Sequence, residues 1–86
     1  SKEILTSRLA ACVTVIPGVR SMYWWEDKLA RANEAMLVVK TTRSQYRRLE
    51  RKILELHSYK VPEIIAVPVV AGLPQYIEWV GDEVAN

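Results

Sequence analysis

Apolar residues at helical spacing predict three helices. A helix is expected over Lys2–Leu9, and the strongest stripe predicts a core-facing helix over residues 46–56. Either Thr42 or Ser44 can cap the start of this second helix. A short closing helix is expected over residues 76–80. The stripes consist, in chain order, of Ile4, Leu5 and Leu9; of Tyr46, Leu49, Ile53 and Leu56; and of Tyr76, Ile77, Trp79 and Val80.

Runs of small and β-branched residues predict strands between these helices. A Pro-Gly pair at residues 17–18 should bend or bulge the first long strand without ending it. The polar segment Glu26–Asn33 is expected to connect the two arms of an antiparallel hairpin. Pro68 removes a ladder donor and places the last strand at an edge or a bulge. The expected strand ranges are Ala10–Ile16, Val19–Trp25, Glu34–Thr42 and Ile64–Val70.

This order of elements predicts one α+β domain over residues 1–86, with an antiparallel sheet and helices on one face. A strand before the first helix would complete the pattern of ferredoxin-like folds. A domain of 86 residues buries only about 60 to 65% of its unfolded surface. We therefore expect oligomerisation to add to its core.

Composition narrows the class of protein. A charged fraction of 26% with a net charge of +2 and 50% hydrophobic residues is typical of a folded soluble domain. No apolar run reaches the roughly 18 residues of a membrane span, and no export leader is evident, so no membrane partner is expected. Because Cys12 is the only cysteine, an internal disulfide is excluded and a cytoplasmic location is expected.

Six short strings, taken together and in order, resemble the CutA divalent-cation-tolerance family over essentially the whole chain. The most specific is HSYKVPEIIA at residues 57–66, and it is accompanied by RLAACV at 8–13 and SMYWWE at 21–26. The remaining matches are residues 34–41, Gly72, and YIEW at 76–79.

The resemblance implies a ferredoxin-like subunit of a cytoplasmic homotrimer that takes part in copper and divalent-metal tolerance. It also implies an architecture similar to the PII signalling proteins. The first strand of the family and the beginning of its first helix have no counterpart in these residues. Because that strand is central in a ferredoxin-like sheet, we expect a gap in the middle of the sheet.

Cys12, His57 and Glu63 are the candidate metal ligands. A thiolate and an imidazole suit copper or zinc, and a carboxylate can complete the site. With one cysteine and one histidine in the chain, a full site must recruit carboxylates, solvent or another subunit. The alternative is that Cys12 is a small buried residue and that His57 only complements a helix C-terminus.

Aromatic residues form a second candidate surface. Adjacent side chains on a strand point to opposite faces, so one of Trp24 and Trp25 must face away from the core. We expect the trimer interface to include Tyr23, Trp24, Trp25 and Trp79. The alternative is that the outward ring lies along its own hairpin.

The resemblance also implies a ligand cleft between subunits. Lys40, Tyr59 and Trp25, with Glu63 nearby, are its expected lining, and Lys40 would hold a small anion. Otherwise Lys40 simply protects a strand end from edge-to-edge pairing.

The helix over residues 46–56 and its approach are basic, with five cations opposed by Glu50 and Glu55. We expect a solvated outer face whose charge is partly offset by partners three and four residues away. No nucleic-acid motif accompanies it, so no nucleic-acid partner is expected. No catalytic signature is present beyond a possible Cys12–His57 pair, so the protein is not expected to be an enzyme. The cations are Arg43, Arg47, Arg48, Arg51 and Lys52.

Overall fold

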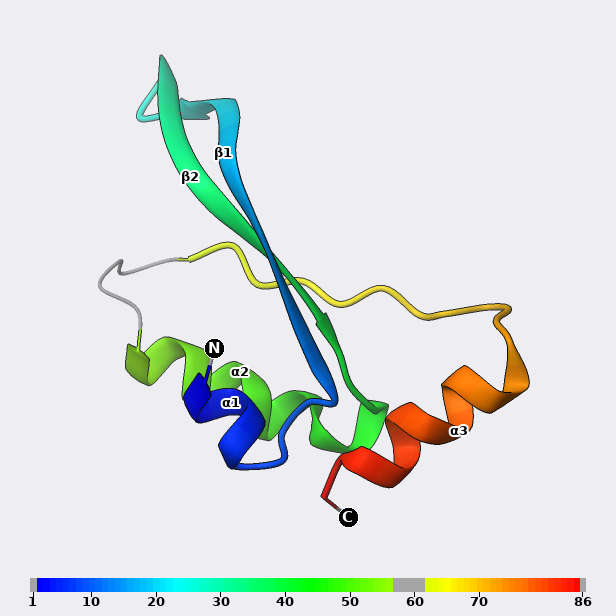
Figure 1. Cartoon of the computed structure of the whole chain (residues 1–86). Helices are drawn as coiled ribbons and strands as arrows, with labels where there is room; N and C mark the ends of the chain where they lie inside the picture. Colours follow the sequence, from blue (N-terminus) through cyan, green and yellow to red (C-terminus); the bar gives the residue numbers. More distant parts are fainter. Residues whose placement is uncertain (1, 57–61, 86) are drawn as a thin grey trace.

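The computed structural model describes residues 2–56 and 62–85. A long two-stranded hairpin rises from a layer of helices, so that the longest dimension of the molecule is 45 Å (Figure 1). Within the described ranges, no helix is both long and apolar enough to cross a membrane. The elements in chain order are α1 (Lys2–Thr6), β1 (Cys12–Trp25), β2 (Lys28–Lys40), the 3₁₀ turn η1 (Arg43–Gln45), α2 (Tyr46–Leu56) and α3 (Pro74–Glu83).

The antiparallel register of the hairpin follows from its turn and one bulge. Cys12 lies opposite Lys40 at the base, and Trp25 lies opposite Lys28 at the tip. The register shifts between Ile16 and Val19, so the Pro-Gly pair makes the bulge that the sequence predicted, with Gly18 at a φ of 71°.

The predicted connection over Glu26–Asn33 is wrong. Only Glu26 and Asp27 form the turn, both at positive φ, and β2 already begins at Lys28. Two consecutive residues at positive φ match the right-handed twist of the strands, which allows a two-residue turn even without Asn-Gly. The polar residues that follow can pair as a strand because neither face of the hairpin tip is buried in the chain.

A small core joins the helices to the base of the hairpin. Ile4 of α1, Ala10 and Leu49 of α2 are buried together, and Val13 and Val39 pack against them from β1 and β2. Val13 and Val39 are also register partners, so one face of the sheet meets both helices. The helices therefore lie on one face of the hairpin base, as predicted.

The end of the described chain is held against this core by polar contacts. The Arg8 guanidinium lies 2.8 Å from the Glu83 carboxylate, and the Ala85 amide donates to the Arg8 carbonyl at 2.9 Å. Gln45, which is only 2% exposed, donates from Nε2 to the Ala85 carbonyl. The Thr42 side chain bonds Ser44 instead of capping the helix, so the predicted cap is not formed.

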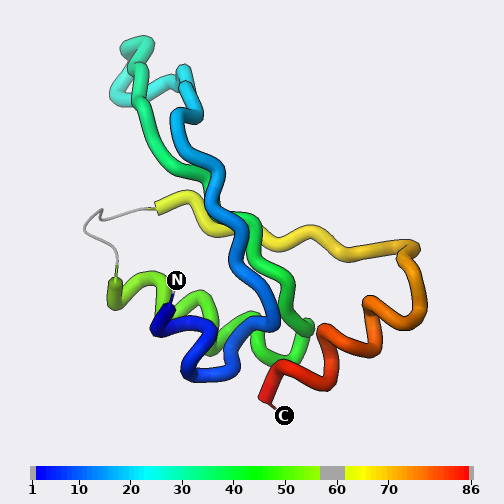
Figure 2. Tube along the Cα trace, viewed as in Figure 1, coloured from blue at the N-terminus to red at the C-terminus, as the bar shows by residue number. Residues whose placement is uncertain are grey.

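The predicted strand Ile64–Val70 is not a strand of this structure. The sheet formed by the described residues has two strands, β1 and β2. Residues 62–73 instead run to α3 as an extended trace, yellow to orange in Figure 2. Most of their apolar side chains are exposed, and Val70 is 93% accessible. A strand needs a neighbour for its ladder, and no described residue supplies one here.

Two glycines provide a matched stability test. Gly18→Ala is expected to lower the free energy of unfolding by about 1 kcal/mol, because an L side chain is strained at positive φ. Gly81→Ala, in α3, is expected to raise it by up to about 1 kcal/mol through helix propensity. An added Cβ meets no described atom within 4 Å at either site. Urea denaturation at one protein concentration measures both, and an unchanged midpoint for Gly18→Ala would contradict the assigned strain.

Candidate functional site

Three polar side chains meet at the base of the hairpin, on the sheet face turned away from the core. Cys12 lies opposite Lys40, and Cys12 and Thr14 share a face because side chains alternate along a strand. Thr14 Oγ1 accepts a hydrogen bond from Lys40 Nζ at 3.2 Å. Cys12 Sγ lies 3.8 Å from the same oxygen. The intervening residues Val13 and Val39 pack toward the helices.

Of the three predicted metal ligands, only Cys12 belongs to this cluster of described side chains. Cys12 is half-buried, and Glu63 is exposed on the extended segment before α3. His57 lies outside the described residues. Among the described residues, no three His, Cys, Asp or Glu side chains gather closely enough to hold a metal ion. The Lys40 ammonium opposes a second positive charge beside the thiol, so a cation needs ligands from beyond this cluster.

The predicted cleft residues lie far apart in one chain. Lys40 is at the base of the hairpin and Trp25 is at its tip. Twelve residues of β2 separate Lys40 from Lys28, the partner of Trp25, which corresponds to about 40 Å of extended strand. Tyr59 lies outside the described residues. A cleft that contains both Lys40 and Trp25 therefore requires two copies of the chain.

Both tryptophans of the hairpin tip are exposed. Trp24 is 75% accessible and Trp25 is 59% accessible. The register places Trp25 on the same face of the hairpin as Cys12 and Lys40. Trp24 lies on the other face, and its register partner is Leu29. Neither ring lies along its own hairpin deeply enough to be buried, so each face of the tip presents an aromatic surface.

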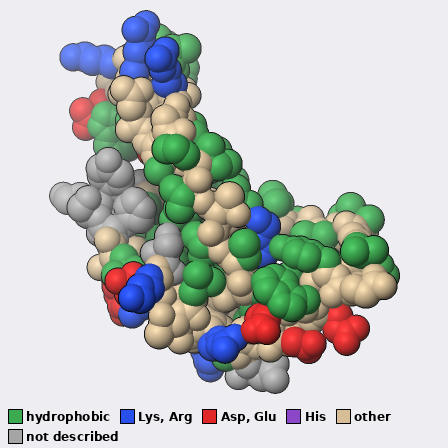
Figure 3. All heavy atoms as spheres, in the orientation of Figure 1, with side chains coloured by type: hydrophobic (Ala, Val, Ile, Leu, Met, Phe, Trp, Pro, Cys, Tyr) green, Lys and Arg blue, Asp and Glu red, His purple; other side chains and the backbone are tan. Residues whose placement is uncertain are grey.

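The remaining predicted interface residues are also accessible. Tyr23 follows the face of Trp25, and Trp79 lies on α3 with its ring centroid 5.7 Å from that of Tyr76. In Figure 3, hydrophobic side chains extend along the hairpin, basic ones gather at its tip and acidic ones lie over α3. Exposed apolar surface of this extent marks an interaction site.

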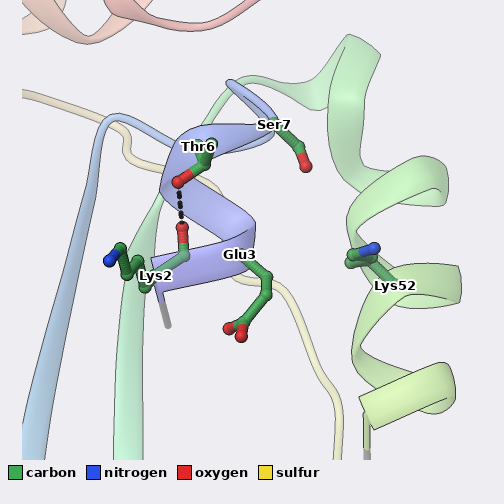
Figure 4. Close-up of a pocket in the computed structure, with 5 residues that line it drawn as sticks. All are labelled: Lys2, Glu3, Thr6, Ser7 and Lys52. Atoms are coloured by element: carbon green, nitrogen blue, oxygen red, sulfur yellow. Dashed lines mark hydrogen bonds between the residues drawn. The ribbon is translucent and has the colours of Figure 1, made fainter.

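Shallow hollows border α2 on the side of α1 and its link to β1. The first, of about 400 Å³, is lined by residues of α1, by Ser7 and by Lys52 of α2, which extends toward the gap in Figure 4. In it the Thr6 hydroxyl donates to the Lys2 carbonyl. The pKa of Glu3 is lowered, first by a backbone hydrogen bond and to a smaller extent by the Lys52 charge.

The contribution of Thr14 is the feature that sequence reasoning missed. Thr14 is two residues from Cys12, which alone indicates a shared face. Its contact with Lys40 depends on the register, and the register depends on the two-residue turn at Glu26 and Asp27. The alternation of side chains was evident from the sequence, but the turn was predicted at the wrong place, so the contact could not be predicted.

Comparison with known proteins decides the family. A sequence model described as "CutA1 divalent ion tolerance protein" matches residues 1–83. The chain belongs to this family. It is 39% identical over 79 residues to the divalent-cation tolerance protein CutA of Thermus thermophilus, covering 92% of this chain and 77% of that protein. It is 42% identical over 77 residues to the rice protein CutA 1, covering 90% of this chain but only 44% of that protein.

Solved structures confirm the fold. The CutA1 structure from Thermus thermophilus superposes with a TM-score of 0.95 at 37% identity, covering 98% of this chain and 82% of that one. The structure described as a PII-like protein CutA from Nostoc, in apo form, gives a TM-score of 0.89 at 31% identity over 98% and 82% of the chains. The predicted family and the α+β, ferredoxin-like class are therefore confirmed.

The names of these relatives bear on two further expectations. The Thermus protein is named for divalent-cation tolerance, and neither name denotes an enzyme. The rice protein is described as chloroplastic, so members of the CutA family are not confined to one compartment.

Proposed function

We propose that this CutA-family chain is one subunit of a cytoplasmic homotrimer that binds a divalent metal ion, with copper as the expected ion. Its role would be divalent-cation tolerance without catalysis. The observation that most supports assembly is the uncovered apolar surface of the hairpin. Metal binding is supported by the family and by the chemistry of its candidate ligands.

The case for assembly begins with the size of the core. The main buried cluster within the chain is Ile4, Ala10 and Leu49, with a few half-buried neighbours. In contrast, large apolar side chains are exposed on both strands and along residues 65–70. Burying such surfaces between subunits contributes about 25 cal/mol per Å². A closed assembly would bury them without leaving an open, growing edge.

The metal site would form only with contributions from beyond the Cys12 cluster. The Cys12 thiolate is a soft ligand that suits copper, and His57 and Glu63 are the proposed imidazole and carboxylate partners. They can come from the same chain or from its neighbour. We propose that metal binding releases the proton of the thiol, because the thiolate is the form that binds a metal ion.

A second candidate function is supported by the contact of Lys40 with Thr14. In this alternative, the chain is a PII-like regulatory module that holds a small anionic ligand between subunits, and metal binding is incidental. Lys40 Nζ would supply the positive charge, while Trp25 of a neighbouring copy and Tyr59 would complete the cleft. The description of the Nostoc structure as PII-like is consistent with this candidate.

Native mass spectrometry of copper-loaded protein tests the proposal. The expected spectrum has the mass of three chains with up to one copper ion per chain. A three-chain mass without retained copper would favour the anion-binding alternative. A single-chain mass at micromolar concentration would contradict the trimer and, with it, both candidate sites that depend on a neighbouring subunit.

A further inference from the structure

The basic face of α2 is only partly neutralised. The only ion pair on α2 among the described residues joins Lys52 and Glu55 at 3.8 Å. Glu50 instead accepts a 2.8 Å hydrogen bond from the Tyr46 hydroxyl, and this carboxylate raises the pKa of Tyr46. The offset by partners three and four residues away is therefore partial, and it is limited to the Lys52–Glu55 pair among the described residues.

None of the four arginines of this face has a carboxylate ion-pair partner among the described residues. Two of them, Arg48 and Arg51, lie on successive turns of α2. The Arg51 Nε donates weakly to the Arg47 carbonyl at 3.5 Å, and this contact leaves its guanidinium charge uncompensated. A guanidinium binds carboxylate or phosphate through paired hydrogen bonds, so these side chains are available to an anionic partner.

The same arginines border a hollow with an apolar wall. This second hollow has a volume of about 380 Å³ and lies between α2 and the link from α1 to β1. Leu9 supplies its apolar surface, and the rim is formed by Arg48, Arg51, Lys52 and Glu55. It combines a place for one aliphatic side chain with an excess of positive charge.

We propose that this hollow docks a short acidic segment of a partner protein. An aliphatic side chain of the segment would contact Leu9, while flanking carboxylates would bind Arg48 and Arg51. Neither Cys12 nor Lys40 lines this hollow. It would let an assembled CutA-family protein recruit a partner from its helical side.

The extent of the surface favours a peptide over nucleic acid. Arg43 to Arg51 spans eight helical residues, or about 12 Å, which matches only a few residues of extended peptide. Beyond the Arg43 end, the end of α3 lies beside the start of α2 (Figure 1), where Gln45 donates to the Ala85 carbonyl. A phosphate backbone gains affinity from many contacts along its length, and a face this short offers few of them.

A binding measurement with matched variants tests the proposal. The probe is a short fluorescent peptide of glutamates with one central leucine, titrated with the intact protein at physiological ionic strength and followed by anisotropy. Arg48→Gln/Arg51→Gln is expected to weaken binding about tenfold or more, because two charge-assisted contacts are lost. Arg20→Gln/Arg31→Gln removes the same charge from the hairpin and should change affinity less than about twofold.

A changed peptide and a competing nucleic acid decide which class of partner the hollow binds. Replacing the central leucine of the peptide by glycine should weaken binding several-fold, because the contact with Leu9 is lost. Equal losses in the two arginine variants would show attraction to net charge alone and overturn the docking site. Tighter binding of single-stranded DNA, with displacement of the peptide, would overturn it in favour of nucleic acid. No measurable peptide binding would also overturn it.

Discussion

The double variant Trp24→Ala/Trp25→Ala is expected to convert the assembled protein into single chains at micromolar concentration. Both rings are exposed in the chain, at 75% and 59%, so the truncation removes little that stabilises the subunit itself. Each ring buried in an interface contributes about 4 to 6 kcal/mol before the costs of association. Analytical ultracentrifugation over a concentration series measures the change.

The control for this experiment is Leu54→Ala. Leu54 is an exposed apolar residue on α2, away from the hairpin, and its truncation should leave the mass unchanged. The two single tryptophan variants then separate the two faces of the tip. If Trp25→Ala dissociates the assembly and Trp24→Ala does not, the interface lies on the face of Cys12. An intact assembly in the double variant would rule out the tip as the interface.

The parts of the hairpin that could be predicted are those whose residues restrict the backbone by themselves. Pro17 and Gly18 predicted the bulge because proline and glycine limit the backbone wherever they occur. Glu26 and Asp27 gave no such signal, although they adopt the positive φ of the turn. The strand from Lys28 to Asn33 was missed because apolar patterning reports burial, and this part of the hairpin is buried by nothing in its own chain.

The segment Ile64–Val70 shows the converse limit. Its β-branched residues indicate a preference for a pleated, packed surface, yet a strand exists only when another strand supplies the ladder. Within the described chain this segment has no such neighbour, and most of its side chains remain exposed. In α2, by contrast, Leu49 is buried as predicted, because a helix satisfies its own backbone and needs only a place for one face.

The candidate site was predictable in residue type but not in arrangement. The chemistry of a thiol, an imidazole and a lysine is evident from composition alone. The structure adds that Lys40 reaches Thr14 beside Cys12, and that Trp25 lies at the far end of the same hairpin. Neither fact follows from spacing along the chain, since each depends on the register of the two strands.

The variant Cys12→Ser/His57→Ala is expected to weaken copper binding at least about tenfold, or roughly 1.4 kcal/mol. It removes the only thiol and the only imidazole of the chain, leaving oxygen ligands that hold copper less well. Calorimetric titration of the assembled protein measures the affinity. Thr14→Val, which keeps both ligands, is the control and should stay within about twofold. Unchanged affinity in the double variant would remove Cys12 and His57 from the metal hypothesis.

Lys40→Ala separates the two candidate functions in the same titration. Lys40 lies opposite Cys12, and its ammonium opposes a cation bound there. Its removal should leave copper affinity equal or higher if the ion sits beside the thiol, since a repulsive charge is lost. If Lys40 instead lines an anion cleft, the variant should bind the anionic ligand of that cleft more weakly, because the ligand loses its positive partner. A fall in copper affinity in Lys40→Ala as large as that in the double variant would place the metal away from Cys12 and would favour a role for Lys40 in shaping the subunit contact.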